Sequence, residues 1–409
     1  MSESEFLEPY ADLAVQVGVN LQRGQYVSIT GLVEHAPMAR ALARAAWRAG
    51  AGYVEVAYRD QHIKRELIEH GSEEALTLTP GWMMKRLDDL AQAQGAAIDI
   101  TGNPEPELFA GLDGARVGRT RMLELSERNG RIVNNAEVAW SIVSYPNDGW
   151  AATVFGEPDV ERLWAAVATA VRLNEADPVE AWRKHMAKLI HRAERMNEHA
   201  FRAVRYRGPG TDLTVGLNPV SIWKAAEFRT AWGIPHVPNL PTEEVFTTPD
   251  WRQAEGRIRS TRPLNVPEHG IVVRDLEFEV EEGRIVDVRA STGGEVIRAQ
   301  TQIDDGAARF GELALVDGKS AVGKTGLTFF DTLFDENATS HIAFGRGISF
   351  CVEGAMGLDQ AGQTALGVND SLIHTDFMVG GPEVDIDGIK EDGSLIPILR
   401  DDVWQLNDR

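Results

Sequence analysis

The chain has 409 residues, which is too long for one ordinary hydrophobic core, so two domains are expected. A hydrophobic content of 43% and a charged content of 25% are typical of a globular enzyme. The formal net charge of −21 argues against nucleic acid and against anionic membranes as partners, because both need a basic surface.

Three further features favour a cytoplasmic protein. The single cysteine, Cys351, excludes an intramolecular disulfide and fits a reducing compartment. The first five residues, Met1-Ser2-Glu3-Ser4-Glu5, are acidic and lack the basic start of a signal peptide. No apolar run approaches the ~20 residues that a membrane span needs.

The first half of the chain alternates between strand and helix patterns. Helices are expected over residues 6–21, 37–49 and 79–94, and strands over residues 25–30, 53–58 and 96–101. Such alternation predicts an α/β N-terminal domain with an open, mostly parallel sheet. The loop after the first strand reads Gly31-Leu32-Val33-Glu34-His35, which is not a dinucleotide-binding fingerprint.

The second half is rich in strands. A charged helix over residues 178–201 contains the expected domain boundary, which we place so that the domains are 1–195 and 196–409. Residues 271–279 and 284–289 read as a hairpin of short alternating strands. We therefore expect a strand-rich α+β C-terminal domain.

Acids and imidazoles recur in this second half at spacings that suit a divalent metal. His374 and Asp376 project to the same face of a strand, because side chains alternate. Glu336 and His341 converge only if Glu336 lies in a turn and His341 in the first turn of a following helix. Two histidines with acidic partners fit zinc, cobalt, manganese or iron better than calcium. The alternative is ordinary hydrogen-bonded pairs of histidine and carboxylate.

Two other stretches contribute carboxylates. Glu243 and Glu244 are adjacent and precede an apolar strand, so alternation lets only one of them face a site. Glu312 is embedded in an otherwise apolar strand, where an unpaired charge is costly. A structural Arg or Lys partner is the alternative to a metal for Glu312.

One motif is interpreted as a coincidence. Residues 318–325, Gly-Lys-Ser-Ala-Val-Gly-Lys-Thr, satisfy the phosphate-loop pattern. A working phosphate loop runs into a helix, whereas residues 326–330 have the pattern of a strand. We expect a Gly-rich turn there.

Nearly end to end, the chain resembles the aminopeptidase T family of metal-dependent aminopeptidases. The matching stretches are residues 239–246, 311–312, 332–343, 367–378 and 385–388. The resemblance implies a site with two divalent metal ions (zinc, cobalt or manganese) in the C-terminal domain, a homodimer, and hydrolysis of a small amine-bearing or short-peptide substrate. Carried over by position, the metal ligands are Glu244, Glu312, Glu336, His341, His374 and Asp376.

Two further roles are our own assignments within the implied site. Glu312 is expected to bridge the two metals, and whichever of Glu243 and Glu244 does not bind metal is the candidate general base. Metal-activated water would attack the amide carbonyl.

The chain departs from the family at Ile348, where the family carries a tyrosine seven residues after the metal-binding histidine. Isoleucine has no hydrogen-bond donor for the reacting carbonyl, and Arg346 is the nearest candidate replacement in sequence. The departure leaves two alternatives open: a non-peptidase metalloenzyme, such as an iron-dependent ring-opening dioxygenase, or a catalytically silent relative.

Overall fold

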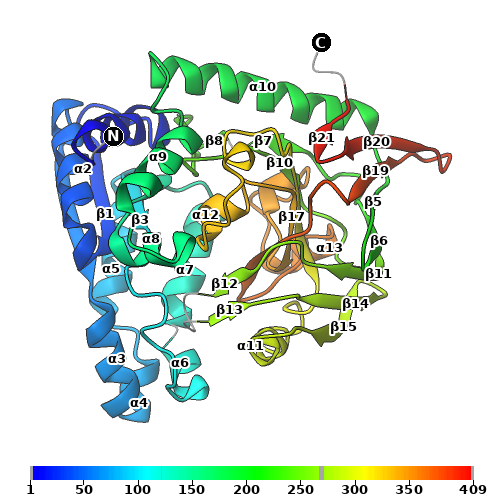
Figure 1. Cartoon of the computed structure of the whole chain (residues 1–409), viewed down its shortest axis with the longest axis horizontal. Coiled ribbons are helices and arrows are strands. Elements are labelled where there is room, and N and C mark those ends of the chain that lie inside the picture. The colour runs from blue at the N-terminus through cyan, green and yellow to red at the C-terminus, as the bar shows by residue number, and fades with distance from the viewer. Residues whose placement is uncertain (1–2, 121, 226, 267–270, 407–409) are drawn as a thin grey trace. The chain divides into compact units, whose positions relative to one another are not determined.

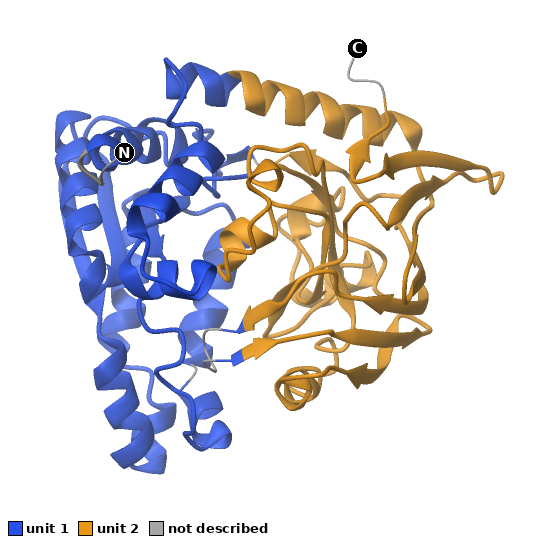
Figure 2. Cartoon of the chain, viewed as in Figure 1, with its two compact units in different colours: residues 1–183, 227–242, 266–271 blue, residues 184–226, 243–265, 272–409 orange. Residues whose placement is uncertain are grey.

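The computed structural model describes residues 3–120, 122–225, 227–266 and 271–406. The chain forms two compact units (Figure 2). Unit 1 comprises residues 1–183, 227–242 and 266–271, and unit 2 comprises residues 184–226, 243–265 and 272–409. Each unit is described separately below.

Unit 1 contains a parallel four-stranded sheet in the order β2-β1-β3-β4. The strands are β1 (Tyr26–Leu32), β2 (Tyr53–Arg59), β3 (Ala96–Thr101) and β4 (Ala139–Ser144). The alternation of strand and helix in the sequence therefore predicts this α/β sheet correctly. In the first strand Val27 and Ile29 are buried, as expected for a strand covered by helices.

Unit 1 contains the three expected helices in the expected order, together with helices that the sequence pattern did not predict (Figure 1). The opening helix α1 ends earlier than expected and continues as a π-helical turn over Ala14–Gly18. The others are α2 (Ala36–Arg48), α3 (Gln61–His70), α4 (Glu73–Thr77), α5 (Gly81–Gln92), α6 (Gly114–Arg119), α7 (Leu123–Asn134), α8 (Asp148–Phe155) and α9 (Val160–Ala170), with α1 at Glu3–Leu13.

A segment from the second half of the sequence also belongs to unit 1. Residues 227–242 carry the short strands β8 (Phe228–Arg229) and β9 (Pro235–His236). Their backbone is held by hydrogen bonds from Val237 N–H to the Gly18 carbonyl and from the Tyr10 hydroxyl to the Leu240 carbonyl. These bonds fix the start of the loop that leads to Glu243.

Unit 2 begins within the long helix α10 (Pro178–His199) and is built from two antiparallel sheets. The larger has eight strands in the order β15-β14-β11-β6-β5-β19-β20-β21. Its strands are β5 (Ala203–Gly208), β6 (Thr211–Gly216), β11 (Ala254–Arg259), β14 (Glu277–Glu281), β15 (Arg284–Arg289), β19 (Asp385–Ile389), β20 (Leu395–Arg400) and β21 (Val403–Trp404).

The smaller sheet has five strands in the order β18-β17-β16-β10-β7. An aromatic cluster connects it to the larger sheet, with Phe278 of β14 lying 5.0 Å from Phe377 and 5.6 Å from Phe344, ring centre to ring centre. The strands are β7 (Lys224–Ala225), β10 (Glu244–Thr247), β16 (Phe310–Val316), β17 (His341–Gly345) and β18 (His374–Met378). The core of unit 2 therefore covers one face of the small sheet.

The remaining elements are short. They are strands β12 (Leu264–Val266) and β13 (Ile271–Val273) and helices α11 (Gly294–Gln300), α12 (Thr332–Asp335) and α13 (Gln360–Ala365). Residues 326–330, expected as a strand, form none, and the preceding Gly323–Thr325 is a single 3-10 turn. None of the helices in the described ranges is both long and apolar enough to cross a membrane.

Candidate metal centre

The strand register of the small sheet places five of the predicted metal ligands on one of its faces. Ala314 lies opposite His341, and Ala343 lies opposite both Glu312 and Asp376. Residues that face each other across antiparallel strands point to the same side of the sheet, as do residues two apart on one strand. The face opposite the aromatic cluster therefore carries Glu244, Glu312, His341, His374 and Asp376.

Glu336 contacts the other ligands from a turn, as expected. The prediction of a helix after this turn is wrong. Helix α12 precedes Glu336 and ends at Asp335, while His341 is the first residue of strand β17. The reversal in direction between helix and strand brings the two residues together, because the His341 ring nitrogen Nδ1 lies 2.9 Å from the Glu336 carbonyl oxygen.

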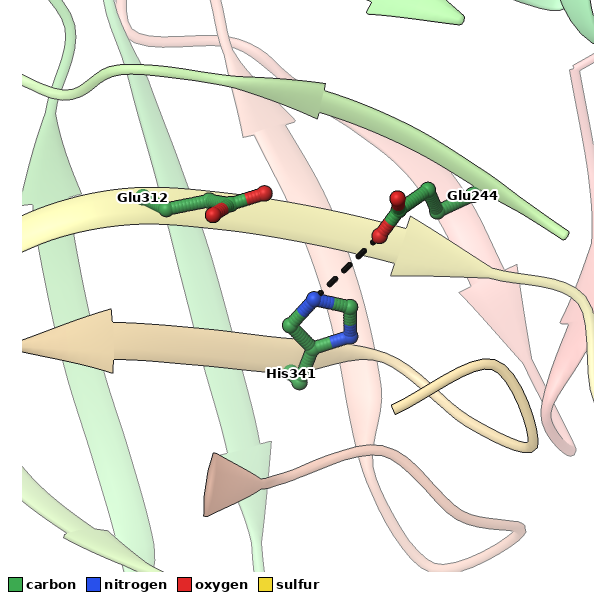
Figure 3. A group of neighbouring side chains, drawn as sticks. All are labelled: Glu244, Glu312 and His341. Carbon is green, nitrogen blue, oxygen red and sulfur yellow. Dashed lines mark ion pairs between the residues drawn. The ribbon is translucent and has the colours of Figure 1, made fainter. Parts of the chain in front are cut away.

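All six predicted ligands have a carboxylate oxygen or imidazole nitrogen in at least one tight group. Three groups of atoms each fit within 4.8 Å: Glu244, Glu312 and His341; Glu312, His374 and Asp376; Glu336, His341 and Asp376. Figure 3 shows the first group, in which three neighbouring strands aim their side chains at one another. The groups overlap at Glu312, His341 and Asp376.

Both histidines are oriented by backbone carbonyls. His341 Nδ1 lies 2.9 Å from the carbonyl of Glu336, and His374 Nδ1 lies 2.8 Å from the carbonyl of Arg346. A carbonyl only accepts hydrogen bonds, so each Nδ1 carries the hydrogen and each Nε2 is directed to the acids. His341 Nε2 lies 3.3 Å from a Glu244 oxygen, and His374 Nε2 lies 3.0 Å from a Glu312 oxygen.

Gly311 and Gly345 shape the strands around these side chains. The pairing of β16 with β17 shifts register between Phe310 and Glu312, so Gly311 forms a bulge that turns Glu312 to the site face. Gly345 has a φ of +103°, and a Cβ there would lie 2.2 Å from the Ile373 carbonyl oxygen. Close approach of the two backbones beside His374 therefore requires glycine at position 345.

The side chains of the site form a cluster of crowded, mostly buried acids and imidazoles. Burial, together with Asp376 and Glu244, raises the pKa of Glu336 well above its ordinary value. Burial also raises the pKa of Glu312. Against the effect of burial, Glu244 and Asp376 raise the pKa of His341 to about 10. A divalent cation would relieve the repulsion among the carboxylates and replace the imidazole proton.

The residues present fit a metal, and Asp376 provides the most direct sign. Its Oδ1 is buried without a hydrogen-bond partner in the described part of the chain, although the Nε2 atoms of His374 and His341 lie 3.6 Å and 3.9 Å away. A buried carboxylate oxygen normally has a partner. Imidazole nitrogens and carboxylate oxygens together are the donor set of zinc, cobalt, manganese or iron.

Glu243 is not part of any of the three groups. It points instead to His185 of α10, whose Nε2 lies 3.4 Å from a Glu243 oxygen, and its other oxygen accepts the Ala321 N–H at 3.2 Å. Alternation thus separates the two adjacent glutamates as expected. His185 carried no sequence signal, because its helix reads as an ordinary charged amphipathic helix.

Arg346 and Ile348 lie in the loop that follows β17. The Arg346 Nε donates to the Ser371 carbonyl at 2.8 Å, and the Ile348 N–H donates to the Thr248 hydroxyl at 2.8 Å. Arg346 contributes its backbone carbonyl to His374, a role that the sequence did not indicate. A catalytic role for the Arg346 guanidinium stays a prediction.

Asn337 is a further residue that sequence reasoning missed. Its side-chain oxygen accepts the Glu243 N–H at 2.8 Å, and its amide nitrogen donates to the Leu333 carbonyl at 2.8 Å and to Glu336 at 3.3 Å. The residue is fully buried. It therefore supports the two acidic stretches of the site from behind.

Comparison with known proteins gives matches over almost the whole chain. The family model of thermophilic metalloproteases (M29) matches residues 3–404. Aminopeptidase T of Thermus thermophilus is 39% identical over 404 residues, covering 97% of this chain and 98% of that protein. Aminopeptidase 2 of Geobacillus stearothermophilus is 35% identical over 405 residues, covering 97% of each.

The fold is similar to that of a solved relative as well. The structure of wild-type AmpT from Thermus thermophilus has a TM-score of 0.90 and 37% identity, covering 99% of this chain and all of that one. The relatives are named aminopeptidases, and nothing in these comparisons supports the alternative of a ring-opening dioxygenase. The resemblance seen in the sequence is thereby confirmed, and the chain belongs to the M29 family of thermophilic metalloproteases.

Proposed function

We propose that this protein is a metal-dependent aminopeptidase that hydrolyses the amide bond after the N-terminal residue of a small, amine-bearing substrate. The observation that carries the proposal is the convergence of two imidazoles and four carboxylates in a chain of the M29 family. When bound, a divalent metal supplies Lewis acidity and lowers the pKa of water, so that hydroxide becomes available for attack at neutral pH.

We assign the ligands of two metal ions to the six residues of the three groups. The overlap of the groups supports this assignment, because two neighbouring ions share ligands. Glu312, our choice for the shared carboxylate, belongs to two groups, as does Asp376. Zinc, cobalt and manganese are the candidate metals, since each accepts both imidazole and carboxylate. The proposed ligands are Glu244, Glu312, Glu336, His341, His374 and Asp376.

The side chains of the chain itself have two tasks in this proposal. The acids of the site attract the protonated amine of a substrate. This attraction holds the first residue of the substrate at the sheet face that carries the proposed metal ligands. Glu243, buried and paired with His185, is the candidate general base, since it adjoins Glu244 in sequence and belongs to none of the ligand groups.

We also propose a cytoplasmic homodimer. The only cysteine, Cys351, is buried and unpaired, as in proteins of a reducing compartment. Strand β2 is the open edge of its sheet and exposes Tyr53 and Tyr58, with 57% and 44% of their surface accessible. An edge strand with exposed aromatic side chains favours association between copies. Light scattering during size-exclusion chromatography tests the dimer.

The experiment for the activity combines elemental analysis with a panel of aminoacyl anilides and short peptides. We expect stoichiometric zinc, cobalt or manganese and release of the N-terminal residue, with no cleavage of N-acetylated peptides. Glu336→Gln should abolish both metal retention and activity, whereas Glu295→Gln, an exposed acid in α11, should change neither. Ferrous iron with oxygen uptake, or full metal occupancy without amide cleavage, would contradict the proposal.

Ile348→Tyr addresses the departure from the family. A hydroxyl added near the site supplies a donor for the reacting carbonyl, and such donors contribute ~10²–10³ in turnover. We expect kcat on aminoacyl anilides to rise by about tenfold or more, because the surrounding loop already has its backbone bonds to Thr248. An unchanged kcat would mean that the missing hydroxyl does not limit this enzyme.

A further inference from the structure

Lys224 lies on the same face of the small sheet as the candidate metal ligands. Strand β7 is the edge neighbour of β10 (Figure 1). In their register Lys224 lies directly opposite Phe246, and Ala225 lies opposite Val245. Opposed residues share a face, and Glu244 is two residues from Phe246 on the same strand. Lys224 and Glu244 are therefore diagonal neighbours, a separation of about 7–8 Å that long side chains reach.

The ammonium group of Lys224 is available to a ligand. The residue is exposed, and within residues 3–120, 122–225, 227–266 and 271–406 no side chain forms an ion pair or hydrogen bond with it. Glu244, the diagonal neighbour on β10, is directed to His341 instead. The cation remains free for an anion that arrives with the substrate.

Two contacts place Lys224 beside the site rather than on a remote surface. The ring of Phe246 packs edge to face on Phe350, at 6.3 Å between ring centres, so the loop that carries Ile348 covers this side of the sheet. The Ile222 N–H donates to the Cys351 carbonyl at 2.7 Å, which ties the approach to β7 to that loop. Burial and the charge of Glu312 raise the pKa of the Cys351 thiol, whereas the charge of Lys224 lowers it. Glu312 and Lys224 therefore both act on this thiol, which lies in the same loop.

The strand order indicates how far Lys224 lies from the proposed ligands on the other strands of the sheet. Strand β7 is three places from β17, which is about 14 Å at ~4.8 Å per strand. The lysine side chain covers part of that distance. An extended peptide spans ~3.3–3.6 Å per residue, so one or two residues beyond the bond being cleaved cover the remainder.

We propose that Lys224 binds the C-terminal carboxylate of di- and tripeptides, and that short peptides with a free carboxylate are the preferred substrates. The inference rests on the aminopeptidase function proposed above and names its substrate class. A carboxylate entering a site of crowded acids is repelled, and a single ammonium group at the correct distance offsets that repulsion. Lysine suits this role because its charge is a compact donor of three hydrogen bonds.

The kinetic test compares a dipeptide with its C-terminal amide in four proteins. In Lys224→Met we expect KM for the free acid to rise about tenfold or more, as for loss of a charge-assisted hydrogen bond, with kcat and the amide unaffected. Lys224→Arg should restore most of the preference. Lys85→Met, which removes an exposed lysine of α5, should behave as wild type. An equal effect on acid and amide overturns the inference.

A binding measurement separates this inference from the activity itself. Calorimetric titration uses a non-cleavable dipeptide isostere with a reduced bond, as the free acid and as the amide. Wild type should bind the acid about tenfold more tightly, and Lys224→Met should bind both equally. A preference that survives in Lys224→Met, or that wild type lacks, overturns the role of Lys224. Acid-selective binding without any cleavage would instead overturn the aminopeptidase function alone.

Discussion

Asn337 holds two parts of the candidate site with one side chain. It accepts the Glu243 N–H and donates to Glu336, and it is fully buried. Asn337→Ala leaves the Glu243 N–H without this partner, and an unsatisfied buried group costs about 1–3 kcal/mol. Loss of support behind a ligand also reduces metal affinity, typically by ~10–100-fold. We expect both effects.

Competition with a chromophoric chelator measures the metal affinity of this variant, and urea unfolding measures its stability. Asn135→Ala is a suitable control, because that side-chain amide donates to Glu137 at the surface of unit 1. A variant that loses stability but keeps the affinity of wild type would show that Asn337 is structural and does not position Glu336.

His236 makes unit 1 sensitive to acid. It is buried and packs edge to face on Phe228. Burial lowers its pKa from 6.5 to about 4, so below pH 6.5 the unfolded chain binds a proton that the folded chain rejects. The contribution of His236 to the free energy of unfolding is therefore complete above pH 6.5. It falls by about 3 kcal/mol as the pH is lowered towards 4.

The unfolding free energy of wild type and His236→Phe, measured between pH 7 and pH 4, checks this expectation. The phenylalanine variant should lose less stability over that interval, because its ring takes up no proton. If the two curves run parallel, His236 is not the source of the acid sensitivity.

At the scale of the element, strands β17 and β18 depend on a glycine. Gly345 has a φ of +103°, and a Cβ there would meet the Ile373 carbonyl oxygen at 2.2 Å. Gly345→Ala should therefore cost about 2–4 kcal/mol, since strained backbone and a steric clash act together. It should also weaken metal binding, because His374 lies directly opposite Gly345.

Gly326→Ala is the matched control for that change. Gly326 also has a positive φ, +65°, but a Cβ there would meet nothing within 4 Å. This control should cost about 1 kcal/mol from backbone strain alone. Urea midpoints for the two variants distinguish the clash from the strain, and equal costs would show that the strands move apart without penalty.

At the scale of the whole molecule, metal should contribute to the stability of unit 2. Without a cation, Glu312 and Glu336 are buried beside other acids, and burial raises the pKa of each. A ligand that binds only the folded state stabilises it in proportion to the logarithm of its concentration. Treatment with a chelator should lower Tm by several degrees, and zinc, cobalt or manganese should restore it.

Calcium is the control for the restoration of Tm by metal, because it binds oxygen ligands and is rarely coordinated by imidazole. Differential scanning calorimetry with each ion measures the effect. Restoration by calcium as well as by the transition metals would point to general screening of acids rather than to a site that uses His341 and His374.

Sequence reasoning predicts the parts of the fold that repeat a simple pattern. The parallel sheet of unit 1 follows from strand and helix alternation, and the shared face of His374 and Asp376 follows from the two-residue period of a strand. The convergence of all six ligands was expected only from the family resemblance. No local pattern reveals that β10, β16, β17 and β18 are neighbours.

The features that were missed depend on contacts distant in sequence. His341 was expected in a helix, yet it starts a strand, because pairing with Ala314 and Met378 outweighs the helix-start pattern before it. His185 and Glu243 are 58 residues apart in the sequence, and only the packing of α10 brings them together. Lys224 belongs to no sequence motif, and only the strand order shows that it lies near the candidate ligands.

The division into units has a consequence for recombination among relatives. Unit 1 includes residues 227–242 and 266–271, which interrupt the sequence of unit 2. A chimera with one crossover near residue 183 would take these two inserts from one parent and the rest of unit 1 from the other. The bonds from Val237 to Gly18 and from Tyr10 to Leu240, which hold the 227–242 insert, would then join mismatched parents. Successful domain shuffling in this family should therefore transfer three segments together.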